Sequence, residues 1–144
     1  MIRKIIKNLS NVPGWSTDRK IVVIESDDWG SIRMPSIACR DQMISEGVPM
    51  GYKERQRYTN FDTLASKEDL SALFDVLSSF KDINNNAPVF TAVSVVANPD
   101  FDQIQKSNYD EYFYEPFTTT LDKYNFEGSF EMWKDGLAHN LFVP

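Results

Sequence analysis

The sequence has little cysteine and histidine and no long apolar run, and each shortage excludes a class of protein. Cys39 is the only cysteine, so the chain forms no internal disulfide, and we expect this side chain to pack as a small residue in a reducing compartment. His139 is the only histidine, which excludes a metal site with two histidines drawn from these residues. No stretch approaches the ~18 apolar residues of a membrane-spanning helix.

Basic residues are in the minority: 15 Lys and Arg stand against 21 Asp and Glu, for a formal net charge of −6 over 144 residues. An acidic chain argues against a general nucleic-acid binder, which presents a basic face, so we predict neither a nucleic-acid nor a membrane partner. Residues 1–9 are basic but lack the continuous apolar core of a secretory signal. We therefore expect a cytoplasmic protein in which this segment forms a short packing helix.

Two apolar runs predict strands, and a strong helix signal lies between them. The first run, Ile21–Glu25, begins with consecutive β-branched residues, which is typical of a strand covered on both faces in a parallel sheet. The second run is Val89–Ala97. Between them, Ser66 and Asp69 have the spacing of a capping box, and apolar residues follow at helical spacing: Leu70, Leu73, Leu77 and Phe80. Strand, helix and strand without a hairpin turn predict a parallel, right-handed β/α unit. We expect Leu70, Leu73 and Leu77 to pack against the strands.

Weaker signals complete the predicted fold class, which is α/β with parallel β/α units in a single domain over residues 1–144. The chain is too short for a complete eight-fold β/α barrel, which takes roughly 200–250 residues. Residues 100–126 are aromatic and acidic without a sustained period, which suits either an excursion near a site or an irregular segment over the end of the sheet. We also predict a helix at residues 35–46 and a loop at residues 50–63. A second helix at residues 128–139 and a third strand at residues 141–143 complete the predicted elements.

Asp27 and Asp28 are the clearest candidates for chemistry. Adjacent carboxylates at the carboxyl end of a buried strand repel each other, and a bound divalent cation would offset their charge. One carboxylate would then hold the ion, and the other would take a proton from a water molecule as general base. The alternative is structural: Asp27 caps the following turn, and Asp28 pairs with Arg33 or Lys20.

The stretch from Ile21 to Pro35 resembles the first motif of the polysaccharide deacetylase (NodB-homology) family, a buried strand that ends in T-F-D-D-G. The resemblance implies an incomplete β/α barrel of the glycoside hydrolase/deacetylase type, and metal-dependent removal of N- or O-acetyl groups from a carbohydrate. It makes Asp27 the general base and Asp28 the metal ligand. The family completes a zinc site with two histidines from an H-x-x-x-H motif, which this chain lacks.

The same comparison suggests residues that contact substrate. Trp29 stands where the family has glycine, and Glu25-Ser26 replaces Thr-Phe; the tryptophan then either stacks on a sugar ring or covers the site. Arg33 either meets a substrate oxyanion or pairs only with the aspartates. Asn98 follows the second strand, where a barrel places a loop of its catalytic face, and it is either a substrate contact or a turn former.

These expectations lead to one main interpretation and two alternatives. In the main one, the chain is the N-terminal part of a longer deacetylase-like barrel, is inactive alone because its metal site is incomplete, and associates with itself through exposed sheet edges. The first alternative is a non-enzymatic remnant or interaction module that binds no metal. The second is a Mg²⁺-dependent phosphoryl-transfer domain, in which Asp27 and Asp28 bind the ion through oxygen alone. Tight zinc binding, no metal binding and weak Mg²⁺ binding distinguish the three.

Overall fold

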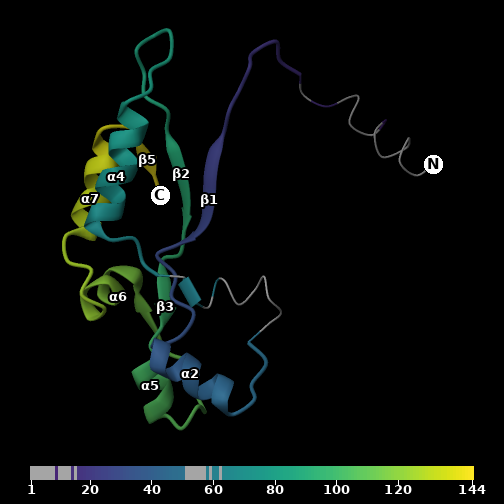
Figure 1. Ribbon diagram of the computed structural model, residues 1–144, viewed down its shortest axis with the longest axis vertical. Helices are drawn as coiled ribbons and strands as arrows, with labels where there is room; N and C mark the ends of the chain where they lie inside the picture. Colours follow the sequence, from purple (N-terminus) through teal and green to yellow (C-terminus); the bar gives the residue numbers. More distant parts are fainter. Residues whose placement is uncertain (1–8, 10–13, 15, 51–57, 59, 62) are drawn as a thin grey trace.

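A three-stranded parallel sheet organises the computed structural model, which describes residues 9, 14, 16–50, 58, 60, 61 and 63–144 (Figure 1). Its strands are β1 (Ile24–Trp29), β2 (Phe90–Ser94) and β5 (Phe142–Val143), in the order β1-β2-β5. Both pairings are parallel. The predicted α/β class and the parallel pairing of the two apolar runs are therefore confirmed. Across the described residues the sheet does not close into a barrel.

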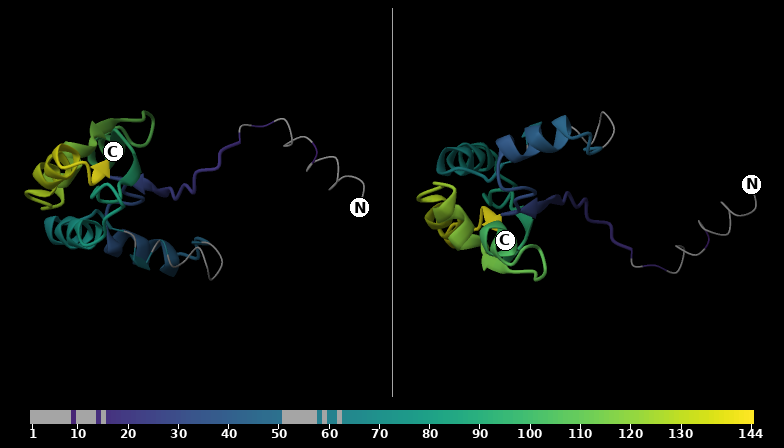
Figure 2. Two further views of the ribbon diagram at one scale, coloured as in Figure 1. Left: turned by 90° about the horizontal axis from the view of Figure 1, so that it is seen from above. Right: turned by 90° about the horizontal axis from the view of Figure 1, so that it is seen from below.

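The first strand begins later than the sequence predicts. Ile21, Val22 and Val23 precede β1 and are 53%, 87% and 70% exposed, and residues 16–23 run away from the sheet (Figures 1 and 2). The prediction that this run is covered on both faces is wrong. The reason is pairing: the partners in β2 begin at Phe90, which lies opposite Ile24, and β-branched residues without a partner strand have no ladder to join.

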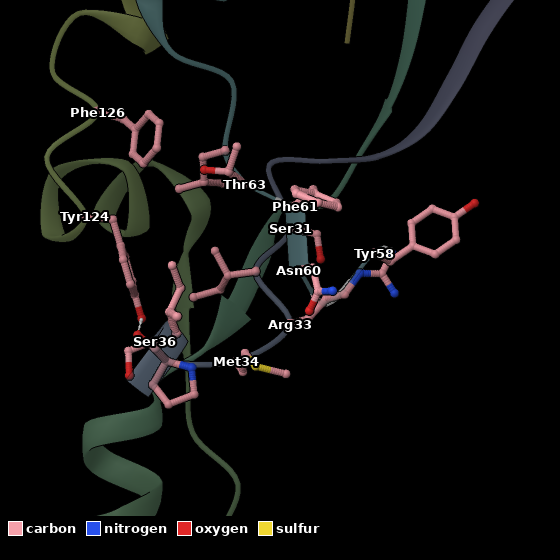
Figure 3. Close-up of a pocket in the computed structure, with 14 residues that line it drawn as sticks. Ser31, Arg33, Met34, Ser36, Tyr58, Asn60, Phe61, Thr63, Tyr124 and Phe126 are labelled. Atoms are coloured by element: carbon pink, nitrogen blue, oxygen red, sulfur yellow. Dashed lines mark hydrogen bonds between the residues drawn. The ribbon is translucent and has the colours of Figure 1, made fainter. Parts of the chain in front are cut away.

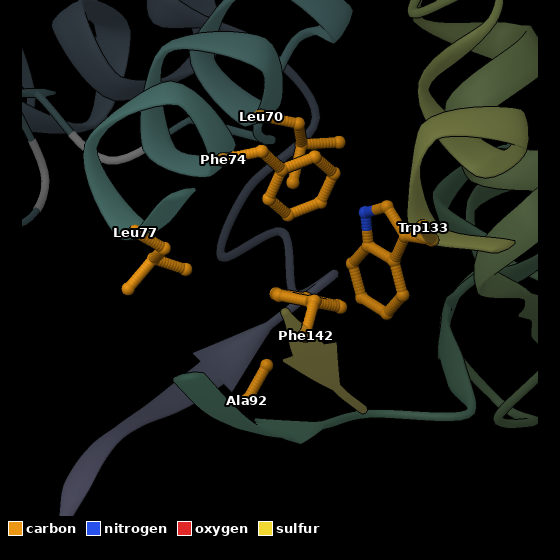
Figure 4. Close-up of a cluster of buried hydrophobic side chains, with 6 residues drawn as sticks. All are labelled: Leu70, Phe74, Leu77, Ala92, Trp133 and Phe142. Atoms are coloured by element: carbon orange, nitrogen blue, oxygen red, sulfur yellow. The ribbon is translucent and has the colours of Figure 1, made fainter. Parts of the chain in front are cut away.

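Two helices cover the sheet and close the core. Helix α4 (Lys67–Ser78) and helix α7 (Ser129–Ala138) pack against each other on one face of it (Figure 1). The predicted capping box is present, because the Asp69 N–H donates to Ser66 Oγ and the Ser66 N–H donates to Asp69 Oδ2. The buried core consists of side chains from α4, β2, α7 and β5, shown in Figure 4: Leu70, Phe74, Leu77, Ala92, Trp133 and Phe142.

The predicted core face of α4 needs two corrections. Leu73 packs against the core as predicted but is only half-buried, and Phe74, which the sequence analysis did not select, is 6% exposed. Phe80 follows the end of the helix and is 63% exposed. The helical stripe that reaches the sheet therefore runs through positions 70, 74 and 77, and Leu73 lies at its margin.

The remaining elements lie beyond the carboxyl ends of β1 and β2. Helix α2 (Ile37–Ser45) begins after Ser36, whose hydroxyl accepts from the Cys39 N–H, as predicted for a helix in residues 35–46. The segment 100–126 is not irregular, which was one of its two predicted forms. It contains two short helices and the strand β4, which pairs antiparallel with β3 just before the segment, and elements this short leave no period in the sequence. Their bounds are Ala97–Pro99 for β3, Phe101–Lys106 for α5, Tyr114–Pro116 for β4 and Phe117–Lys123 for α6.

Two further predictions concern segments that lie mostly outside the described residues. The helix expected in residues 1–9 and most of the loop expected in residues 50–63 lie outside the described residues. In the part of the chain that is described, no helix has the length and apolar character needed to cross a membrane.

Candidate functional site

The aspartate pair lies in a bulge at the carboxyl end of β1. Ser26 pairs with Ala92 and Trp29 with Ser94, so β1 holds one more residue than β2 over this stretch. Asp28 absorbs the extra length with φ 61, in the left-handed region that aspartate tolerates better than most residues. The carboxylates are thus part of the end of the strand, as predicted, and both side chains are exposed.

Asp28 is paired with Arg33. Its Oδ2 lies 2.8 Å from Arg33 Nη2, and the two side chains are 59% and 42% exposed. An exposed pair of this kind contributes little to stability, about 0–1 kcal/mol. The guanidinium group also lies over the ring of Tyr58, at 5.6 Å from the ring centre. The structural alternative for Asp28, a pair with Arg33, is therefore the arrangement present.

A cleft of about 390 Å³ opens beside the pair. Its lining includes Asp27, Asp28 and, from the start of α4, Asp69. The N–H and hydroxyl of Ser66 both donate to the Asp69 carboxylate, and these bonds hold its pKa below the usual 3.8. The cleft is therefore lined by three carboxylates, and hydrogen bonds from Ser66 stabilise the ionised form of the Asp69 carboxylate.

The described residues do not fit the zinc site that the family resemblance implies. A catalytic zinc site takes three protein ligands and keeps one position open for water. Among the residues that the structure describes, no group of three or more His, Cys, Asp or Glu side chains is placed to hold a metal ion. His139 lies at the end of α7, where its Nδ1 is 3.3 Å from Asp135 Oδ1, and it is exposed there.

Asn98 lies directly behind the loop that follows the aspartates. It is 2% exposed, its Oδ1 accepts from the Ile32 N–H at 3.0 Å, and its Nδ2 donates to the Gly30 carbonyl at 2.7 Å. The same Nδ2 lies 3.2 Å from Thr120 Oγ1. The carboxamide is therefore used within the protein, where it positions the loop.

Behind Asn98 lies a network of polar side chains that extends from the interior to the surface. The sequence analysis did not identify this network. Thr120 Oγ1 donates to Glu115 Oε1 at 3.1 Å, and Glu115 is 7% exposed. Lys123 Nζ lies 3.5 Å from Glu115 Oε2 and 2.8 Å from Asp102 Oδ2, and the hydrogen bond to Asp102 is the main cause that raises the pKa of Lys123. This polar network connects α6 and β4 to the loop after β1. Its members are too far apart in sequence to form a motif.

Trp29 belongs mainly to the core. Its ring contacts those of Phe90 and Phe142 edge-on, with ring centres 5.3 Å apart in both cases, and that of Trp133 at 6.2 Å. It also lines the cleft beside the aspartates. Of the two predicted roles, covering the site matches these contacts.

A second pocket, of about 260 Å³, is lined in part by the loop after β1 (Figure 3). Tyr124 and Phe126 stand on one side of it, and Arg33 and Tyr58 stand on the other. The Tyr124 hydroxyl donates to the Pro35 carbonyl at 3.2 Å, and burial raises the pKa of this tyrosine. The two aromatic residues were not predicted individually, because they come from the segment 100–126, in which the sequence shows no sustained period.

Comparison with known proteins found no family model, no curated protein and no solved structure that matches this chain.

Proposed function

We propose that this chain carries part of a carbohydrate deacetylase site, which hydrolyses N- or O-acetyl groups, on an incomplete β/α barrel of the glycoside hydrolase/deacetylase type. The observation that carries the proposal is the position of Asp27 and Asp28, at the carboxyl end of a parallel strand and beside a cleft. Ligands of α/β folds gather at this end of the sheet, because the loops there are free to vary.

Asp27 is the proposed general base. Its side chain is exposed in the cleft, so it can accept a proton from a water molecule that attacks an acetyl carbonyl. The Asn98 carboxamide, which binds Gly30 and Ile32, holds the loop that follows the base. By the resemblance, Asp28 is the proposed metal ligand, but the described residues include no set of side chains that fits zinc.

The competing candidate is a non-enzymatic interaction module that binds no metal. It is favoured by the ion pair between Asp28 and Arg33, since one oxygen of the proposed metal ligand already has a cationic partner. The two candidates differ in whether a metal ion binds at Asp28.

The proposal includes self-association in the cytoplasm. Strand β1 is an edge of the sheet, and the apolar residues before it are exposed, Val22 at 87%. An unpaired edge beside such residues can pair with a second copy. Sedimentation should show a dimer for the wild type and a monomer for Val22→Lys; a wild-type monomer at high concentration would contradict this part.

The test of function combines binding with hydrolysis. Acetylated chito-oligosaccharide and acetylated xylan are added to the ¹⁵N-labelled chain, and the amide shifts of Asp27 and Asp28 are followed by NMR while released acetate is measured with zinc present. We expect one of the two carbohydrates to move both amide signals, with negligible release of acetate. Unchanged signals with both carbohydrates would contradict the site.

The hydrolysis arm has its own control in Asp27→Asn. Robust release of acetate that this substitution abolishes would support Asp27 as base and would contradict the conclusion that the zinc site is incomplete. Robust release of acetate that is equal in wild type and Asp27→Asn would contradict the role of Asp27.

A further inference from the structure

We propose that the 260 Å³ pocket beside Arg33 and Tyr124 binds a single neutral pyranose ring, the sugar unit next to the acetyl group. This inference rests on the proposed function, because it names the place at which the site holds its carbohydrate. The pocket is lined by residues from the loop after β1, the start of α2, the segment before α4 and the segment after α6.

The size of the pocket favours one ring. Pockets for drug-sized ligands measure about 300–1,000 Å³, and this one has about 260 Å³. It is therefore too small for two linked sugars to be enclosed, and further units of an oligosaccharide would extend into solvent.

The walls have the mixed chemistry that a sugar ring requires. Tyr124 and Phe126 give one side an aromatic surface, Met34 lies along the bottom edge in Figure 3, and Pro35 also lines the pocket. Polar side chains stand across from them, including Asn60, whose Oδ1 accepts from Arg40 Nη1 at 3.1 Å. A pyranose has apolar C–H faces and a rim of hydroxyl groups, so it can place a face on the rings and its rim on the polar groups.

The charge of the pocket favours a neutral sugar over an acidic one. Arg33 is the only charged residue among the described residues that line it, and its guanidinium group is paired with Asp28 at 2.8 Å. The pair has no net charge, so an added carboxylate would have to compete with Asp28 for the guanidinium group.

The pocket also has the right position for this role. Thr63 and Leu64 line both the pocket and the cleft that holds Asp27 and Asp28. Arg33 connects the two as well, since it lines the pocket and binds Asp28. A ring in the pocket would therefore direct a substituent toward the aspartates.

The test is an NMR titration of the full chain with N-acetylglucosamine, glucose and glucuronate as probes. For a ligand of this size we expect a Kd on the order of 1 mM, shift changes at the Ser36, Ile37 and Phe126 amides, and intermolecular NOEs from the Tyr124 ring to sugar ring protons. Binding of glucuronate ten-fold tighter than both neutral sugars would overturn the assignment of a neutral ligand. No NOE to Tyr124 at saturation would overturn the pocket.

Variants at one position separate the ring from its hydroxyl. Tyr124→Ala should weaken binding about 2- to 10-fold, which corresponds to the loss of one aromatic contact. Tyr124→Phe keeps the ring and removes only the bond to Pro35, so it should bind within about two-fold of wild type. The exposed Tyr109 supplies the matched control, Tyr109→Ala, with unchanged affinity. If Tyr124→Ala binds as tightly as this control, the pocket is not the sugar site.

The outcomes also separate this inference from the proposed function. Shifts at Asp27 and Asp28 without shifts at Phe126 would leave the deacetylase site in place and overturn the pocket. Shifts and NOEs in the pocket with the neutral monosaccharides, without any change at the aspartates on adding acetylated oligosaccharide, would support the pocket and contradict the deacetylase site.

Discussion

Replacing Asn98 by alanine should destabilise the protein strongly, because the side chain joins the loop after β1 to the rest of the fold. The substitution removes three hydrogen bonds and leaves the Gly30 carbonyl, the Ile32 N–H and Thr120 Oγ1 without that partner. A buried polar group that loses its partner costs about 1–3 kcal/mol. Since water can reach the half-buried Ile32 more easily than the other two, we expect a total loss of about 3–5 kcal/mol. That is a large part of the ~5–15 kcal/mol available to a typical domain.

The assay is urea unfolding followed by the tryptophan fluorescence, with the free energy of unfolding obtained by linear extrapolation. The control is Asn84→Ala, because Asn84 is exposed in the connection before β2; its effect should stay within about 0.5 kcal/mol. If Asn98→Ala costs less than about 1 kcal/mol, the carboxamide does not hold the loop, and the argument that it positions Asp27 and Asp28 fails.

Three further predictions test the core and the capping box. Phe74→Ala should cost about 3–5 kcal/mol in urea unfolding because the ring is 6% exposed, whereas Phe80→Ala, at a residue 63% exposed, should cost far less; equal effects would contradict the assigned core face. Gly136→Ala should lower stability by about 1–3 kcal/mol, since its new methyl group would run into the Phe74 ring, and a neutral result in thermal unfolding would show that the helices separate easily. The pKa of Asp69 is lowered by the hydrogen bonds from Ser66, so its stabilisation is present above its ordinary pKa near 3.8 and is lost as the pH falls through the lowered value. Asp69→Asn should therefore be less stable at pH 7 and lose less stability than wild type on acidification from about pH 5 to 2; parallel curves would exclude this contribution.

The sequence predicted those parts of the fold that have a local cause. The capping box at Ser66 and Asp69 marked the start of α4, and the valine-rich run beginning at Val89 contained β2. Strand, helix and strand in this order led to the parallel pairing. Each of these features depends on neighbouring residues, so its signal is contained in a short window.

What the sequence left out depends on contacts between distant segments. The exposed run before β1 looked like a buried strand, because β-propensity does not reveal where a partner strand ends. Phe74 was missed because the position of the sheet decides which side of α4 is buried. The pair β3–β4 and helix α6 are too short for a period to be seen.

The candidate site was predicted in part. The position of Asp27 and Asp28 at the carboxyl end of β1 and the pair between Asp28 and Arg33 were among the stated possibilities. The hydrogen bonds by which Asn98 holds the loop after β1 were not predicted, because its partners lie 66 and 68 residues away in the sequence. The Tyr124 wall of the pocket likewise comes from a segment with no recognisable pattern.

The central claim is that carbohydrate binds at the carboxyl end of β1 with its acetyl group at Asp27. The most direct test is a crystal structure of the chain with an acetylated chito-oligosaccharide at a concentration that saturates binding in solution. The account predicts one sugar ring against Tyr124 and an acetyl carbonyl in the cleft, close enough to Asp27 for one water molecule to join them. A sugar bound only at another surface, with the cleft and the pocket both empty, would contradict it.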